Sequence, residues 1–262
     1  MKTKITLSVL ISICMLFAFS SCHSNHNDSR DEAELYNEAL PVHAFENWIC
    51  GLYKNHPVKT VVIKTFELDN DSTPNDEVGL ALIKKVVENY SQDYSSATEI
   101  ETSKTKEGDD STTYYKYLIQ DGILIEKINP QDPCCKMVYT YSSDYEYSVT
   151  RYDLLEDGSY APHDYSYTTT LDSHYNTIKV KETNSLKTGG TTLTEYFKPN
   201  KNNDYTYLTF NADVNSNQEF EYLKYDKNDN WTIRKVKSTT KNKRRKVVTK
   251  YTMEKRTIEY YN

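Results

Sequence analysis

The sequence predicts a mainly β protein, an antiparallel β-meander that forms an extended open or half-wrapped sheet of about nine to twelve strands after short N-terminal helices. Apolar and polar residues alternate through most of the chain after residue 96, and turn-forming residues separate the alternating runs. Tyrosine is over-represented, with 24 copies in 262 residues. Only 37% of residues are apolar and the mean hydropathy is −0.78, which leaves little material for a thick core. Because tyrosine covers apolar area while keeping a wet hydroxyl, thin sheets with partly exposed faces are favoured over a closed sandwich.

The first 22 residues have the features of an export signal. Lys2 and Lys4 give a positive start, and an apolar run of roughly 15 residues follows from Ile5 to Phe19. A membrane-spanning helix needs about 20 apolar residues, so this run has the length of a signal-peptide core. Phe19-Ser20-Ser21-Cys22 resembles a bacterial lipobox. The resemblance implies cleavage before Cys22 and lipidation of Cys22 with diacylglycerol and fatty acid such as palmitate. The alternative is an ordinary secretory signal that is cut nearby.

The segment after the cleavage site is expected to be a flexible tether. Residues 22–34 are polar and nearly free of apolar side chains, so they cannot pack. With residues 1–21 as the signal peptide, the sequence predicts an outer-membrane lipoprotein of the cell envelope, held on the membrane by its lipid anchor. Asp28, Asp31 and Glu32 resemble a surface-export signal of some Gram-negative bacteria. The periplasmic and the surface-facing side of the membrane both remain open.

The mature chain is acidic. Loss of Lys2 and Lys4 with the signal peptide leaves 241 residues with 30 basic and 38 acidic side chains, a net charge of −8. An acidic chain of this size argues against nucleic acid as a partner.

Three cysteines remain after removal of Cys14 and lipidation of Cys22: Cys50, Cys134 and Cys135. A disulfide between Cys50 and one of the adjacent pair is one alternative, and free thiols are the favoured one. The absence of Cys-x-x-Cys spacing gives no support for a metal or redox site.

Residues 35–95 are expected to form a mixed helix and strand segment. Apolar residues at three- and four-residue steps between Leu35 and Leu52 indicate helix, and Pro41 divides it into two short helices. Val58–Leu68 is rich in β-branched and aromatic residues, which predicts a strand. Pro74–Tyr90 fits a helix by its four-residue step and a strand by its likeness to the segments that follow. The helix is favoured.

Residues 96–262 are expected to form a tyrosine-rich antiparallel β domain. Period-two alternation occurs at Tyr139–Tyr141, Tyr145–Val149, Tyr165–Leu171, Tyr205–Thr209 and Val247–Met253. Turn signals lie at Asp121-Gly122, Asp157-Gly158, Gly189-Gly190, Asn200–Asp204 and Asn228–Asn230. Asp-Gly and Gly-Gly tolerate the positive φ of tight turns, so each strand should pair with its sequence neighbour.

One turn resembles a known repeat. Residues 224–232, which include Tyr225-Asp226 and Asn230-Trp231, resemble the YD repeat, the Tyr-Asp-x-x-Gly-Asn-Trp unit of bacterial RHS-type shells and of many Bacteroides-type lipoproteins. The segment departs from the motif at Asp229, where glycine is usual. Degenerate copies begin at Tyr90, Tyr117, Tyr141 and Leu171, and the gap before Tyr225 has room for one more. The resemblance implies a β-hairpin scaffold with no chemistry of its own.

The sequence indicates no catalytic or metal site, and no cofactor is expected. Asp69–Pro74 and Asp226–Trp231 echo the opening of a calcium loop but lack its glycine and its final glutamate, so solvated turns are favoured over calcium. His163-Asp164 could orient a general base, and an exposed loop is the favoured interpretation. No Gly-x-Ser-x-Gly elbow or phosphate loop occurs.

Two features have a binding interpretation. The basic run Lys241–Lys246 is expected to be a charged hairpin tip, with contact to anionic envelope polymer or lipid head groups as the alternative. Aromatic side chains on a sheet can stack on sugar rings or hold a protein partner, although cross-strand pairing explains most of the tyrosines. The candidate ligand contacts are Tyr145, Tyr147, Tyr165, Tyr167 and Trp231.

The sequence therefore predicts a non-enzymatic envelope lipoprotein whose β scaffold binds a glycan or protein partner. Two alternatives stay open: an envelope hydrolase acting on polysaccharide or peptide, and a purely structural assembly component. Two convergent carboxylates about 5 to 10 Å apart in a deep pocket would favour the hydrolase.

Overall fold

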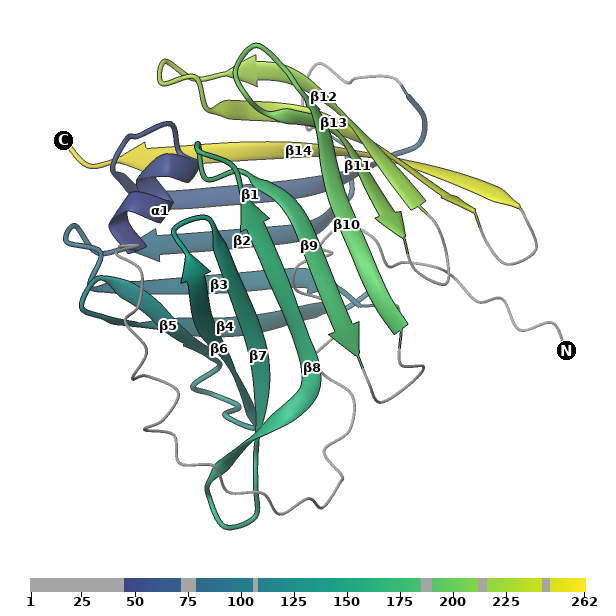
Figure 1. Ribbon diagram of the computed structural model, residues 1–262. Coiled ribbons are helices and arrows are strands. Elements are labelled where there is room, and N and C mark those ends of the chain that lie inside the picture. The colour runs from purple at the N-terminus through teal and green to yellow at the C-terminus, as the bar shows by residue number, and fades with distance from the viewer. Residues whose placement is uncertain (1–44, 72–78, 106–107, 185–189, 212–215, 242–245) are drawn as a thin grey trace, which may run out of the picture.

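The computed structural model describes residues 45–71, 79–105, 108–184, 190–211, 216–241 and 246–262. The predicted signal peptide, Cys22 and the tether lie outside them. In the described part, one helix, α1 (Phe45–Leu52), accompanies fourteen strands that form a closed antiparallel barrel (Figure 1). The strands are β1 (Val58–Leu68), β2 (Leu82–Tyr90), β3 (Ser96–Lys104), β4 (Asp110–Gln120), β5 (Ile123–Ile128), β6 (Cys135–Ser143), β7 (Glu146–Leu154), β8 (Tyr160–Leu171), β9 (Thr177–Asn184), β10 (Gly190–Pro199), β11 (Tyr205–Asn211), β12 (Ser216–Tyr225), β13 (Trp231–Lys241) and β14 (Val247–Tyr260).

The predicted antiparallel meander is confirmed, but the sheet is neither open nor limited to about nine to twelve strands. β1 pairs with β2 on one side and with β14 on the other, so that Val61 lies opposite both Glu88 and Ile258. Closure removes the two sheet edges, which would otherwise leave a row of unpaired N–H and C=O groups. The low apolar content favoured an open sheet, yet the inner wall is lined by tyrosines and paired charges, which a barrel can enclose without a thick apolar core.

Residues 74–90 account for part of the difference between the expected and the observed number of strands. Val58–Leu68 forms β1 as predicted, whereas the helix favoured over 74–90 is wrong, because Leu82–Tyr90 forms β2. Residues four apart share a face in a strand as well as in a helix, so the step that relates Leu82, Val86 and Tyr90 fitted both. Pairing of β2 with β1 and β3 decides for the strand.

Helix α1 lies across one end of the barrel (Figure 1). Its buried residue Ile49 joins a core cluster with Val61 and Leu124 from the barrel wall. Gly51 lies against the ring of Tyr175, so closely that an added Cβ would sit 1.9 Å from the ring carbon Cδ2. The helix therefore caps this end. One of the two predicted helices is present in the described residues.

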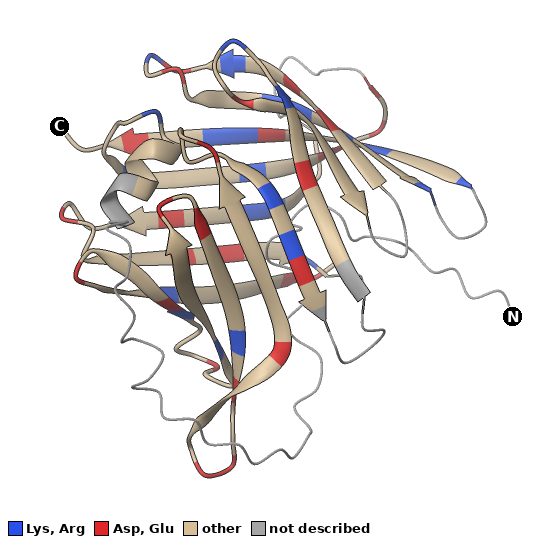
Figure 2. Cartoon of the chain, viewed as in Figure 1, with Lys and Arg blue, Asp and Glu red and all other residues tan. Residues whose placement is uncertain are grey.

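Alternation along each strand separates an inner from an outer face. On β9, Val180 is buried between the exposed Lys179 and Lys181. Around the barrel, cross-strand partners share a face, as Glu88 and Glu99 do on β2 and β3. Lysines, arginines and acids are spread along the strands as well as the turns (Figure 2).

Three connections at the α1 end share one turn geometry, and they lie where the sequence indicated turns or repeat-like hairpins. In Asp172–Asn176, Asn200–Asp204 and Asp226–Asn230, the first residue's backbone N–H donates to the fifth residue's carbonyl, and its side-chain oxygen accepts from the fifth residue's N–H. The fourth residue has positive φ: 61° at Tyr175, 62° at Asn203 and 60° at Asp229. Glycine is usual at such positions because it has no Cβ.

The segments that resemble YD repeats all fall at this end. They begin near the ends of β2, β4, β6, β8 and β12, and the gap left for one more copy contains the turn between β10 and β11. Asp121-Gly122 and Asp157-Gly158 also lie in turns, with positive φ at Asp121, Gly122 and Gly158. Gly189 lies outside the described residues, as do positions 242–245 of the basic run, which connects the paired strands β13 and β14.

No helix in the described ranges has both the length and the apolar character needed to cross a lipid bilayer.

Candidate functional site: the inner wall of the barrel

A group of five tyrosines lines one side of the inner wall, here called the tyrosine wall. It comprises Tyr139, Tyr141, Tyr147, Tyr165 and Tyr167 from β6, β7 and β8. The ring centroid of Tyr147 lies 5.9 Å from that of Tyr139 and 5.8 Å from that of Tyr141, and Tyr165 and Tyr167 are 6.3 Å apart. All five side chains are half-buried. Because they point inward, their exposed area faces the barrel interior.

The tyrosine wall continues onto helix α1. The ring of Trp48 meets the ring of Tyr147 edge-on at 6.0 Å, so the helix forms the floor beneath the wall. Burial raises the pKa of Tyr139 and Tyr141 well above the ordinary value of tyrosine, which keeps both hydroxyls neutral at physiological pH. A neutral phenol can both donate and accept a hydrogen bond.

The opposite side of the barrel carries a cluster of aromatic rings and cations. Trp231, the first residue of β13, is 7% exposed and lies under two arginines. The guanidinium carbon of Arg234 is 4.3 Å from the Trp231 ring centroid, and that of Arg256 is 3.9 Å from it. Arg234 is ion-paired with Glu254, with Nε to Oε2 at 2.6 Å. Although burial acts in the opposite direction, Glu254 and Tyr222 raise the pKa of Arg234.

Two glutamates, Glu88 and Glu99, are cross-strand partners on β2 and β3. They bear on the hydrolase alternative, which requires two convergent carboxylates. Glu99 is 1% exposed, and its Oε2 accepts from Tyr117 and from Lys127, the latter at 3.0 Å. Glu88 accepts from Tyr90 at 2.9 Å and from Tyr53 at 3.3 Å. Burial raises the pKa of Glu88, and the charge of Glu99 raises it further.

These carboxylates are built into the wall. Glu99 has almost no exposed surface, so a substrate could not reach it without a rearrangement of β2 to β4. A glycosidase needs both of its carboxyl groups at the scissile bond. In this conformation, the pair Glu88 and Glu99 gives the barrel wall its hydrogen-bond network and does not form a substrate-facing acid and base.

The five tyrosine and tryptophan positions predicted as ligand contacts separate into three places. Tyr147, Tyr165 and Tyr167 are brought together on the tyrosine wall. Tyr145 lies in the turn after β6, 41% exposed and 5.6 Å from the Tyr175 ring centroid. Trp231 is buried across the barrel, covered by the two arginines. The sequence analysis did not single out Arg234 or Arg256. The only sequence feature that could have indicated them is a positive charge at a strand position where the alternation places inward residues.

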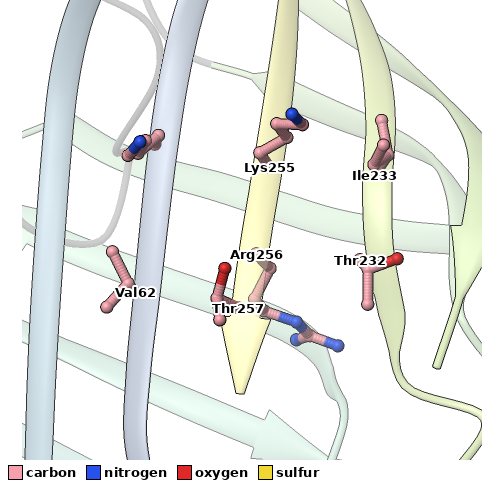
Figure 3. Close-up of a pocket in the computed structure, with 7 residues that line it drawn as sticks. Val62, Thr232, Ile233, Lys255, Arg256 and Thr257 are labelled. Atoms are coloured by element: carbon pink, nitrogen blue, oxygen red, sulfur yellow. The ribbon is translucent and has the colours of Figure 1, made fainter. Parts of the chain in front are cut away.

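A depression of about 230 Å³ lies on the wall formed by β1, β13 and β14, mostly on its outer face, because Val62 and Lys64 alternate with the inward Val61 and Ile63. It is lined by Val62, Lys64, Thr232, Ile233, Lys255, Arg256 and Thr257. Figure 3 shows the Arg256 side chain extending from β14 toward β13. Small-molecule sites usually occupy at least about 300 Å³, so this depression is small for a ligand pocket.

Two segments echoed the opening of a calcium loop, and part of Asp69–Pro74 lies outside the described residues. In the other, the carboxylate oxygens of Asp226 accept hydrogen bonds from protein groups. Asp226 Oδ1 accepts the N–H groups of Asn228 and Asn230, and Oδ2 accepts the Tyr260 hydroxyl at 2.6 Å. Across the described ranges, no three His, Cys, Asp or Glu side chains are grouped in a way that could hold a metal ion. The exposed loop expected at His163 is wrong, because His163 is half-buried in β8. Its Nε2 lies 3.7 Å from Asp153 Oδ2, so its neighbouring acid is Asp153 on β7.

The cysteines among the described residues, Cys50, Cys134 and Cys135, are free thiols. Cys50 is part of α1 at the capped end, whereas Cys135 begins β6 at the other end. The favoured expectation of free thiols therefore agrees with the structure. Burial, together with the neighbouring Cys135, raises the pKa of Cys134 to about 12, so this thiol is a poor nucleophile at neutral pH.

Neither a known protein-family profile nor a curated protein sequence matches this chain.

Proposed function

We propose that this chain is the precursor of an envelope lipoprotein whose barrel binds a glycan chain inside, without catalysing a reaction. The tyrosine wall carries the proposal. Its five half-buried rings share one face of three adjacent strands and continue onto Trp48 in the capping helix. Such rings stack on the apolar faces of sugar rings, while their hydroxyls exchange hydrogen bonds with sugar hydroxyls.

The position of the wall favours a glycan over a folded protein partner. The tyrosines point into a barrel that α1 caps at one end, and a folded protein surface would have to enter that barrel to touch them. A glycan chain is narrower than a folded protein, and we propose that it enters at the end away from α1. Tyrosines on the outer face, such as Tyr207 beside Phe197, would be open to either kind of partner.

Binding to soluble oligosaccharides from bacterial and host glycans tests this proposal by calorimetry on the mature chain. Replacement of Tyr147 and Tyr167 by alanine should weaken binding by at least tenfold, because each removes a ring from the wall. Tyr207→Ala, on the outer face of β11, is the matched control and should leave the affinity unchanged. Equal affinity in the inner-wall and outer-face variants would count against the interior as the binding site.

The envelope location is tested separately. We propose that Cys22 carries the lipid anchor and that residues 22–34 tether the barrel to the outer membrane. A Cys22→Ala variant should leave the membrane fraction in cells. Protease digestion of intact cells then decides between the two sides, because a surface-facing barrel is cut and a periplasmic one is protected.

The alternative functions give different results. A hydrolase would release products from its polysaccharide or peptide substrate, and an assembly component would form a stable protein complex without glycan binding. The YD-repeat-like hairpins are compatible with all three, since we propose that they build the scaffold only.

A further inference from the structure

The two arginines on Trp231 differ in their partners. Arg234 shares a charged pair with Glu254. For Arg256, no carboxylate among the described residues lies within 4.0 Å of a side-chain nitrogen. Its nearest companions are the rings of Trp231 and Tyr53, at 3.9 and 5.3 Å from its guanidinium carbon, and Ile63 is its cross-strand partner. Asp204 attracts the Arg256 charge from farther away, but Asp204 is itself paired with Lys54 at 3.1 Å. Among the described residues, Arg256 therefore has no acid in direct contact.

Arg256 also keeps most of its hydrogen-bonding capacity. A guanidinium has five N–H groups in a planar fork. Its Nε donates to the main-chain carbonyl of Trp231 at 2.8 Å, and the two end nitrogens make no hydrogen bond within the described part of the chain. The side chain is half-buried, and Arg256 alternates with the outward Lys255 and Thr257, which places it on the inward face of β14 beside Trp231 and Tyr53. Burial, with Arg234 adding to it, lowers the pKa of Arg256 from the usual arginine value, and an anion would relieve this cost.

We propose that Arg256 is an oxyanion-binding residue and that the ligand of the barrel is an acidic glycan, one that carries carboxylate or sulfate groups. This inference rests on the proposed function and adds the ligand's charge. The forked end of an arginine matches two oxygens of one carboxylate or sulfate. The arginine and the tyrosine wall share the helical floor: Tyr53 just beyond α1 faces Arg256, and Trp48 within α1 faces Tyr147. An oligosaccharide on this floor contacts tyrosines with its rings and Arg256 with its acid group.

The anion site can be tested without any glycan, through the fluorescence of Trp231. Trp48 is the other of the two tryptophans, so a Trp48→Phe variant leaves Trp231 as the reporter. Sodium glucuronate and sodium sulfate, each titrated at constant ionic strength with sodium chloride, should change the emission with saturation. The change should vanish in Trp48→Phe/Arg256→Gln. A flat titration with both anions in the parent variant would overturn the assignment, whatever the glycan experiment shows.

Calorimetry with matched oligosaccharides then separates the two proposals. Uronic-acid, sulfated and neutral chains of equal length are compared on the mature protein. Arg256→Gln should weaken the acidic chains about ten- to a hundredfold and leave the neutral ones unchanged. Arg256→Lys keeps the charge but not the fork, so it should lose part of the affinity for acidic chains. Lys255→Gln, at the adjacent position on the opposite face of β14, should lose none of it.

Equal binding of acidic and neutral chains overturns the charge assignment and leaves the glycan proposal standing. Saturable glucuronate binding without affinity for any oligosaccharide refutes the glycan proposal and leaves the oxyanion site.

Discussion

Asn230 donates from Nδ2 to the main-chain carbonyl of Tyr53 at 3.0 Å, which joins residues 177 positions apart in the chain. The same nitrogen donates to the Tyr260 hydroxyl at 2.8 Å, and that hydroxyl donates to Asp226 at 2.6 Å. Through these contacts the turn between β12 and β13 holds the end of β14 and the residue that follows α1. The repeat-like turn therefore fastens the cap to the barrel.

Replacement of Asn230 by alanine should destabilise the protein by about 1–3 kcal/mol, because the side chain is 0% exposed and its removal breaks two buried hydrogen bonds, to the Tyr53 carbonyl and to the Tyr260 hydroxyl. The Tyr53 carbonyl then keeps only the longer bond from the His56 N–H, at 3.3 Å. Urea unfolding followed by circular dichroism measures the loss. Lys227→Ala in the same turn is the control, since Lys227 is exposed and should leave stability nearly unchanged. Equal stability of the two variants would show that the Asn230 bonds do not hold the cap.

Contact between α1 and the turn after β8 gives a prediction about side-chain volume. Gly51→Ala would place a Cβ 1.9 Å from Tyr175 Cδ2, so we expect a loss of about 1–3 kcal/mol. Tyr175 has φ 61°, which glycine adopts without strain, so Tyr175→Gly removes the ring and keeps the turn. In a Tyr175→Gly background, Gly51→Ala should then cost little. A four-variant thermal unfolding cycle measures the coupling, and additive losses would contradict the contact.

The charged pair on the inner wall of β3 and β5 should be sensitive to loss of its cation. Lys127 is 6% exposed and Glu99 1%, with 3.0 Å between Nζ and Oε2. Lys127→Met leaves a buried carboxylate without its charged partner and should destabilise the protein by about 3–5 kcal/mol. The double variant with Glu99→Gln should recover most of this loss. Lys59→Met, which breaks the exposed pair with Glu259, should have little effect in the same unfolding experiment.

Glu88 predicts a pH dependence. Burial, and then Glu99, raise its pKa in the folded state above the ordinary value for glutamate. The folded state therefore holds the proton at pH values where the unfolded chain has released it. Stability falls as pH rises from the unfolded pKa, about 4.3, through the raised folded value. Glu88→Gln removes this titration, so the variant should gain stability relative to the parent between pH 4 and pH 7. Unfolding free energies of the parent and of Glu88→Gln, measured across that range, check this. A difference between the two proteins that stays constant with pH would contradict the raised pKa of Glu88.

The turns could be predicted from the sequence because their chemistry is local. Asp226, Asp172 and Asn200 each accept backbone N–H groups within four residues, so the residue type alone indicates the turn. Closure of the barrel could not be predicted in this way, because it is not a local property. It depends on β1 lying beside β14, a pairing that no local pattern of Val58–Leu68 specifies.

From the sequence, the candidate site could be predicted only to the extent of which side chains share a face of a strand. Alternation places Tyr165 and Tyr167 on one face of β8, but it cannot say that this face is the inside of a barrel. Arg234 and Arg256 are at inward positions that alternate with outward ones. From sequence alone, an arginine that points into the barrel cannot be told from one that points into solvent. Their shared contact with Trp231 appears only when β13 and β14 are paired.

The pairing that closes the barrel also sets an order on its folding. Lys59 and Glu259 form an ion pair at 2.7 Å although they are 200 residues apart. During synthesis β1 can pair with β2 early, but its other edge waits for the last strand to emerge. Contacts of such sequence separation form slowly, and an unpaired edge invites association with other chains while it waits. Under the proposed export, this interval would fall after the chain has crossed the membrane, and the free edge of β1 would stay open until β14 arrives.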